Sequence, residues 1–136
     1  MSMEQALSHL TERIRAAIAD RVPLRIRGGG SKDFYGCRWQ GEVLSTADLR
    51  GVRSYEPSEL VVTVAAGTPL SELEQLLAAQ GQCLPFEPPH LGWSVGAPTV
   101  GGMVASGLAG PARASVGGVR DYVLGVQLIN GRGEAL

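Results

Sequence analysis

Apolar residues recur at helical spacing over residues 3–20 of this chain. The pattern predicts a helix with these apolar residues on one face. They are Leu7, Leu10, Ile14, Ala17 and Ile18. Pro23 then ends the pattern, and Leu24 and Ile26 alternate with two arginines. An alternation of period two predicts a strand over residues 24–27. The chain therefore opens with a helix followed by a strand.

Three further short runs predict extended structure, at residues 42–45, 52–55 and 60–65. The four residues between the last two runs read Glu-Pro-Ser-Glu, which is turn chemistry. Two short strands joined by four residues make a hairpin plausible. Together with the flanking helices, these runs favour an α+β fold.

A second helix is predicted to begin at Thr68 and Pro69, a good N-cap followed by a good first helical residue. Its buried stripe consists of leucines, namely Leu70, Leu73, Leu76 and Leu77. Gly81 is a suitable residue for ending it. We expect this helix to be scaffold.

Two irregular segments follow the second helix. Residues 83–98 carry four prolines and His90, so we expect a rigid wall in which the histidine is either a surface residue or a ligand contact. Residues 99–110 are mostly small, which permits close backbone packing against a flat ligand or against the protein core. Both alternatives stay open at this point.

A strand is predicted over residues 122–129, and Asn130-Gly131 predicts a hairpin turn after it. A hairpin needs a returning strand, and only residues 132–136 follow this turn. We therefore expect the chain to be the front portion of a longer protein, or a fragment.

The stretch Arg27-Gly28-Gly29-Gly30-Ser31-Lys32 is the strongest candidate for binding chemistry. Three consecutive glycines are costly to order, which a chain accepts where the backbone must turn or approach a ligand closely. Successive backbone N–H groups between two basic side chains can bind an anion. The spacing matches neither a Walker A loop nor a Rossmann fingerprint. The alternatives are a phosphate cradle and a flexible surface turn.

Composition narrows the function classes. The 136 residues suffice for one domain with a core, and 44% apolar residues exclude disorder as the main state. A net charge of −1 and 5% aromatic residues give no case for nucleic acid or an anionic membrane as partner. We find no secretory signal and no membrane span. Cys37 and Cys83 lack metal-ligand spacing, so we expect no metal, reduced packing thiols and a cytoplasmic protein.

The order of the motifs resembles a known family. The motifs are Arg-Gly-Gly-Gly-Ser-Lys (27–32), Pro-Ser-Glu-Leu-Val-Val-Thr-Val (57–64), Ala-Gly-Thr-Pro-Leu-Ser-Glu-Leu (66–73), Leu-Pro-Phe-Glu-Pro-Pro (84–89), Thr-Val-Gly-Gly (99–102) and Val-Arg-Asp-Tyr-Val-Leu-Gly-Val-Gln-Leu-Ile-Asn-Gly-Arg-Gly-Glu (119–134). Together they resemble the FAD-binding subunits of bacterial glycolate oxidases. These are flavoproteins of the vanillyl-alcohol-oxidase type with a PCMH-type FAD-binding domain.

The resemblance implies two small α+β subdomains, about 1–65 and 66–136, with FAD between them. Residues 1–136 would then be an incomplete PCMH-type domain. The cofactor-binding residues implied are Arg27, Gly28, Gly29, Gly30, Ser31, Lys32, Pro88, Thr99, Val100, Gly101, Gly102, Ser106, Gly118 and Asp121. The glycine loop would lie on the FAD pyrophosphate, and residues 117–121 would help to wall the cofactor.

The resemblance also implies an activity, the oxidation of a small 2-hydroxy acid such as glycolate with flavin as hydride acceptor. Some relatives attach flavin through a histidine in the first glycine loop, and Ser31 and Lys32 stand here instead, so we expect non-covalent FAD. The substrate domain of the family is absent, and no spacing identifies a catalytic base. Partner subunits, including an iron–sulfur subunit, are implied, with any membrane association made through them. The alternatives are a non-catalytic accessory subunit and, less favoured, a nucleotide-phosphate binder unrelated to flavin.

Overall fold

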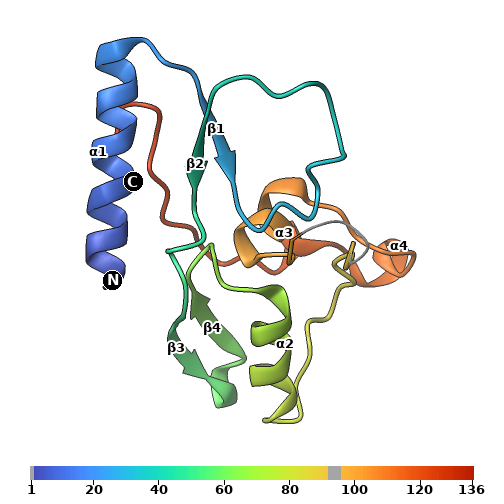
Figure 1. The fold of residues 1–136 in the computed structure, drawn as a ribbon. Coiled ribbons are helices and arrows are strands. Elements are labelled where there is room, and N and C mark those ends of the chain that lie inside the picture. The colour runs from blue at the N-terminus through green and yellow to red at the C-terminus, as the bar shows by residue number, and fades with distance from the viewer. Residues whose placement is uncertain (1, 92–95) are drawn as a thin grey trace.

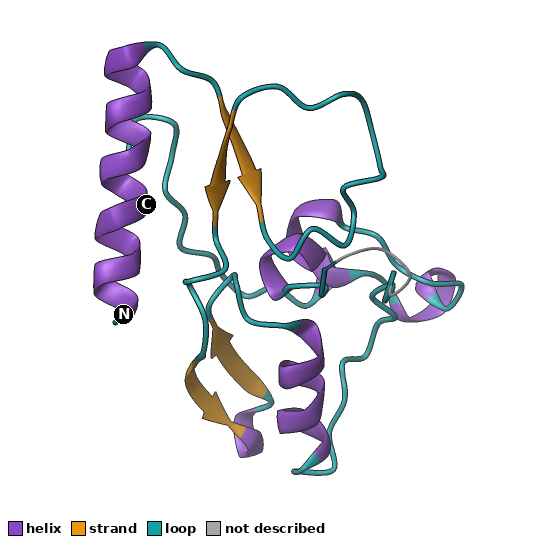
Figure 2. Ribbon diagram, viewed as in Figure 1, coloured by secondary structure: helices purple, strands orange, loops and turns teal. Residues whose placement is uncertain are grey.

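The computed structural model describes residues 2–91 and 96–136 (Figure 1). Within these ranges the elements are α1 (Met3–Asp20), β1 (Leu24–Arg27), β2 (Glu42–Ser45), β3 (Val52–Glu56), the 3-10 turn η1 (Pro57–Glu59), β4 (Val61–Val64), α2 (Leu70–Ala78), α3 (Val100–Ser106), α4 (Arg113–Val116) and the 3-10 turn η2 (Val119–Asp121). One helix precedes the four strands, and the other helices follow them along the chain (Figure 2), which confirms the predicted α+β class.

The first helix is confirmed with its predicted bounds, and a reciprocal cap fixes its start. The Gln5 backbone N–H donates to Ser2 Oγ at 3.2 Å, and the Ser2 backbone N–H donates to Gln5 Oε1 at 2.8 Å. Of its apolar face, Leu10 is buried whereas Ile18 is 52% exposed. The C-terminal half of α1 is therefore only partly covered by the described chain.

Two separate two-stranded sheets follow. β1 and β2 pair in parallel, from Leu24 opposite Glu42 to Arg27 opposite Ser45. β3 and β4 pair antiparallel around η1, with a bulge near Val52, which confirms the predicted hairpin. The parallel pair lies beside α1, and the hairpin lies beside α2 (Figure 1).

The main core joins α2, α3 and the β3–β4 hairpin. Its buried members are Leu70, Leu73, Leu77, Phe86, Val100, Met103 and Val119. Tyr55, Val62 and Val64 of the hairpin pack against this cluster. The hairpin thus contacts the core of the later half of the chain, while the predicted subdomain boundary near residue 65 stays a prediction.

The sequence predicted Thr68 as the N-cap of α2, and this prediction is wrong. The helix begins one residue later than expected, with Pro69 at the N-cap and Leu70 as the first helical residue. Thr68 is fully buried, and its hydroxyl accepts a 2.9 Å hydrogen bond from the Gly51 backbone N–H. A partner distant in sequence therefore takes the side chain that the local pattern assigned to the cap. Gly81 does adopt the left-handed φ of +67° expected after the helix.

The predicted strand over residues 122–129 is wrong, and its turn differs in detail. Within the described chain this segment forms no regular strand, and only its end pairs, with Ile129 opposite Ala135. Leu124 is 83% exposed. The hairpin is real, yet the left-handed residue is Gly133 (φ +70°) rather than Gly131, and the Asn130 side chain accepts from two backbone N–H groups in the turn.

The two cysteines differ from expectation. Cys37 and Cys83 are free thiols, but both are exposed, so the expectation that they are packing residues is wrong.

Among the described residues, no helix combines the length and apolar character needed to cross a membrane.

We expect Leu73→Ala to lower the free energy of unfolding by about 2–5 kcal/mol, because it would leave a cavity at a side chain that is 2% exposed. Urea unfolding measures this change. Leu124→Ala is the control: its side chain is 83% exposed, so its effect should stay within about 0.5 kcal/mol. Equal losses in the two variants would contradict the assigned core.

Candidate functional site

A hollow of about 350 Å³ lies between the loop that follows β1 and the helix α3. Its wall is formed by Arg25, Ile26, Arg27, Gly28, Gly29, Gly30, Ser31, Lys32, Asp33, Tyr35, Trp39, Thr99, Gly102, Ala105, Ser106 and Leu108. Figure 1 shows β1 running toward α3 before the chain turns away. We call this hollow the loop pocket. It brings together the two glycine-rich segments that the sequence singled out, although about 70 residues separate them.

The glycine loop can meet residues 96–99 because glycines stand at the points of contact. A Cβ placed on Gly29 would lie 1.7 Å from the carbonyl oxygen of Ala97, and one placed on Gly96 would lie 1.7 Å from that of Gly29. A Cβ on Gly28 would lie 2.6 Å from Thr99 Oγ1. All three distances are far below contact distance. The glycines are therefore required for packing within the protein, in addition to any ligand.

Charge in the loop pocket is arranged around Asp33. Its Oδ1 accepts from Arg25 Nη2 at 3.0 Å, and its Oδ2 accepts from Arg27 Nε at 2.7 Å. The Arg25 guanidinium also lies 5.2 Å from the centre of the Trp39 ring, within range for a cation–π contact. The hydrogen bond from Arg27 lowers the pKa of Asp33 and raises that of Arg27. Asp33 and Arg27 are therefore both charged at neutral pH.

The period-two pattern of β1 gives the strand two different faces. Arg25 and Arg27 line the loop pocket. Leu24 lines a second hollow, which holds about 460 Å³. Ile26, although 75% exposed, reaches the wall of both hollows.

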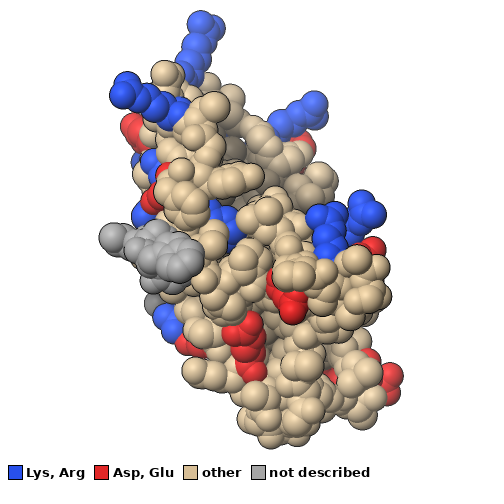
Figure 3. Space-filling model, turned by 90° about the vertical axis from the view of Figure 1, so that its right-hand side faces the viewer, with Lys and Arg blue, Asp and Glu red and all other residues tan. Residues whose placement is uncertain are grey.

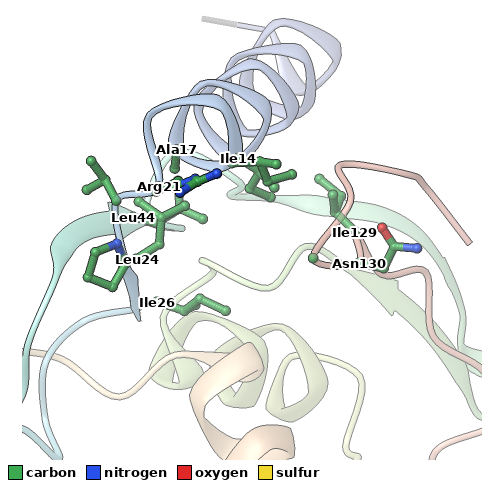
Figure 4. Close-up of a pocket in the computed structure, with 12 residues that line it drawn as sticks. Ile14, Ala17, Arg21, Leu24, Ile26, Leu44, Ile129 and Asn130 are labelled. Atoms are coloured by element: carbon green, nitrogen blue, oxygen red, sulfur yellow. The ribbon is translucent and has the colours of Figure 1, made fainter.

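This second hollow is mainly apolar and lies between α1, the β1–β2 pair and the C-terminal hairpin. Figure 4 labels Ile14, Ala17, Arg21, Leu24, Ile26, Leu44, Ile129 and Asn130 on its wall. Arg21 is the one charged side chain among its lining residues in the described chain. The hollow therefore lacks the cluster of cations that an anion would need, and the loop pocket is the better candidate site.

The first turn of α3 packs against the protein, and its backbone N–H groups are engaged in hydrogen bonds within the protein. The Val100 N–H donates to Thr68 O at 2.9 Å, and the Gly101 N–H donates to Ala66 O at 2.7 Å. The Gly102 N–H donates to Thr99 Oγ1 at 3.2 Å, as the N-cap of α3 requires. A Cβ on Gly101 would lie 2.8 Å from that of Ala66. Of the two alternatives left open for residues 99–110, tight helix packing therefore describes this part of α3.

The predicted cofactor residues divide into two groups. Those on the wall of the loop pocket are Arg27, Gly28, Gly29, Gly30, Ser31, Lys32, Thr99, Gly102 and Ser106. Those outside it are Pro88, Val100, Gly101, Gly118 and Asp121. Val100 belongs to the core, and the Gly118 N–H donates to Asp121 Oδ2 at 2.8 Å, which closes the turn η2.

Sequence reasoning missed several residues of the pocket. Arg25, Tyr35 and Trp39 line it, and Gly96 and Ala97 pack against the glycine loop. The alternation in β1 was a usable signal for Arg25, because residues two apart on a strand share a face. The loop of residues 33–41 has no periodicity, so its aromatic residues carried no such signal.

The carboxylates and the histidine within or beside the predicted cofactor segments all have structural partners. Asp33 contacts two arginines, and Glu87 Oε2 accepts from the Ala112 N–H at 3.0 Å. Asp121 closes η2, as described above. His90 Nε2 lies 2.8 Å from Glu74 Oε1 on α2, which places this histidine on the scaffold. The described chain therefore presents no free base pointing into the loop pocket.

Charges elsewhere on the surface are mixed. On the face shown in Figure 3, basic and acidic side chains are interspersed rather than gathered into one broad patch. This distribution agrees with a net charge of −1. The clustering of cations at the loop pocket is therefore local.

The chain is similar to known proteins over most of its length. Residues 6–136 match the family described as "FAD binding domain". The chain is 48% identical over 127 residues to the glycolate oxidase subunit GlcE of Escherichia coli (strain K12). The match covers 93% of this chain and 35% of that protein, so the chain spans about a third of its relative.

Solved structures share the fold. The protein named wild-type Phl p 4.0202, a glucose dehydrogenase, superposes with a TM-score of 0.72 at 21% identity. A Phl p 4 variant described as a glucose oxidase gives a TM-score of 0.72 at 22% identity. Each match covers 96% of this chain and 26% of the other. At this level of identity the likeness concerns the fold alone.

We expect Gly29→Ala to destabilise the protein by about 3 kcal/mol, because its Cβ cannot coexist with the Ala97 carbonyl oxygen unless two backbones separate. Chemical unfolding measures the change. Gly125→Ala serves as the control, since a Cβ there meets nothing within 4 Å and should change the free energy by about 0.5 kcal/mol or less. A Gly29→Ala protein as stable as the control would show that the two segments do not pack as described.

Proposed function

This chain belongs to the family of FAD binding domains, and from that premise we propose that it is the FAD-binding part of a flavoprotein that oxidises glycolate or a similar 2-hydroxy acid. One observation carries the proposal. A chain 48% identical to a glycolate oxidase subunit retains a glycine-walled, cationic pocket where the motifs converge. Because the chain spans 35% of that relative, the proposed activity is that of a longer protein.

The loop pocket fits the anionic part of FAD. Three basic side chains on its wall, Arg25, Arg27 and Lys32, stand against one carboxylate, Asp33, which leaves a net of two positive charges. The diphosphate of FAD carries two negative charges. Five consecutive loop residues, Gly28–Lys32, also line the pocket and bring main chain to its wall. Arg27, Lys32 and the loop backbone would hold the diphosphate.

The role of this chain in the reaction is binding and orientation. FAD, when bound, supplies the hydride acceptor. Arg27 and Lys32 neutralise the cofactor's charge, while the packed glycines keep the loop backbone close to it. Thr99, Gly102 and Ser106 form the opposite wall. The rigid contact between loop and helix fixes the distance across the pocket, which orientation of a cofactor requires.

The predicted cofactor residues outside the loop pocket also have proposed roles in FAD binding. We place Pro88, Gly118 and Asp121 along the continuation of the cofactor site, since α3 contacts η2 and thus links the pocket to this region. Val100 and Gly101 act by seating α3, because their backbone N–H groups are engaged within the protein. Substrate contacts and the proton acceptor come from the part of the relative that this chain does not match.

The relative is named as a subunit, and we propose that this chain works with other oxidase subunits, an iron–sulfur subunit among them by family resemblance. The alternative of a purely accessory subunit is not favoured. A scaffold that did not bind FAD would have no need for Arg25, Arg27 and Lys32 to gather on one pocket wall.

The first test uses the full-length protein. Glycolate added without oxygen should bleach the flavin absorbance, and glucose, the sugar named for the structural neighbours, should not. Arg27→Gln with Lys32→Gln should weaken FAD binding about tenfold or more, because two charge-assisted contacts are lost. Arg113→Gln with Arg132→Gln, which removes the same charge outside the pocket, is the control.

Two results would contradict the proposal. Full flavin content in the Arg27/Lys32 double variant would favour the accessory alternative. Bound flavin that glucose bleaches and glycolate does not would leave the FAD site in place but overturn the substrate class.

A second test concerns how FAD is attached to the protein. We propose that FAD is held without a covalent bond, since Ser31, which is 5% exposed, and Lys32 stand in the loop where some relatives carry a histidine. Acid precipitation of the holoprotein should release all of its flavin into the supernatant. Yellow colour that stays with the washed precipitate would show a covalent link.

A further inference from the structure

Asp33 links the glycine loop to β1 through both arginines of one strand face. Its two carboxylate oxygens are divided between them: Oδ1 faces Arg25, and Oδ2 faces Arg27, whose Nη2 lies 2.6 Å away. Both arginine side chains are partly covered, with 22% and 36% of their surface exposed. One carboxylate thus fixes the directions of two guanidinium groups that line the loop pocket.

The surrounding residues support this arrangement. Trp39 Nε1 donates to the Asp33 carbonyl oxygen at 3.3 Å, and its ring lies against Arg25. The third glycine makes room for the ion pair: a Cβ on Gly30 would lie 2.2 Å from Arg27 Nη2 and 3.0 Å from Asp33 Oδ2. Gly30, whose φ of +79° also favours glycine, thus leaves room for the Arg27–Asp33 pair.

A negative charge in a pocket for an anionic ligand would ordinarily weaken binding. At this position it has a compensating effect. Free arginine side chains lose rotamer freedom when a ligand orders them, and this loss reduces affinity. Asp33 imposes that order before the ligand arrives, and it leaves the other N–H groups of both guanidiniums available.

We propose that Asp33 is a positioning residue for the diphosphate site: it holds Arg25 and Arg27 in the orientation that receives the ligand. The inference rests on the proposed FAD function and extends it by one residue that does not itself contact the diphosphate. It also brings Arg25 into the site, which the family motif Arg27–Lys32 does not include.

Two substitutions in the full-length protein separate positioning from charge alone. Asp33→Asn removes the negative charge, and Asp33→Glu keeps it but moves the carboxylate by one methylene group. Positioning predicts that both variants bind FAD more weakly, Asp33→Asn by about tenfold. Charge alone predicts tighter binding for Asp33→Asn and no change for Asp33→Glu. Dissociation constants are measured by flavin fluorescence on protein stripped of cofactor.

A further comparison separates positioning from a general structural role. ADP and adenosine, used as competitors, differ in the diphosphate. Positioning predicts that Asp33→Asn weakens ADP binding and leaves adenosine binding unchanged, whereas a structural defect weakens both. Asp48→Asn is the control, since Asp48 is exposed and lies outside the loop pocket. If Asp33→Asn does not fold, Asp33→Glu decides by the same criteria.

Each outcome has a defined meaning. Failure of the unmodified protein to bind FAD would overturn the proposed function. Two results would overturn this inference alone, provided that the unmodified protein binds FAD. One is equal or tighter FAD binding by Asp33→Asn. The other is an equal loss of affinity for ADP and for adenosine.

Discussion

The loop pocket depends on a close contact between two stretches of main chain, which glycines at the points of contact make possible. Gly29 and Gly96 each approach a carbonyl oxygen of the other segment so closely that no Cβ fits. The loop after β1 is thereby held against the start of α3, and the space between them becomes the pocket. Glycines are entropically costly to order, so such a cluster indicates a contact that other residues cannot make.

The short strand β1 separates two environments. Its arginine face supplies charge to the loop pocket, and Leu24 on its other face belongs to an apolar hollow beside α1. A strand of four residues can do this because successive side chains point to opposite faces. The loop pocket therefore lies on one face of a short sheet whose other face is partly uncovered within the described chain.

The two walls of the pocket have different roles. On the helix side, the backbone N–H groups of Val100 and Gly101 are engaged in internal hydrogen bonds, so this wall fixes geometry. On the loop side, Arg27 and Lys32 bring charge, and Asp33 orders two of the basic side chains. Rigid scaffold on one side and charged groups on the other is an arrangement that can grip and orient a large anionic cofactor.

The sequence by itself determined the elements set by local periodicity: α1, the β3–β4 hairpin, α2 and the glycine loop with its cations. It also determined the family, because the family's motifs occur in their usual order along the chain. Tertiary structure alone decided that Thr68 bonds to Gly51 instead of capping α2, that residues 122–127 find no partner strand in the described chain, and that Asp33 joins two arginines. The physical reason is that caps, strand pairs and ion pairs each need a partner, and here the choice of partner depends on groups that only folding brings together.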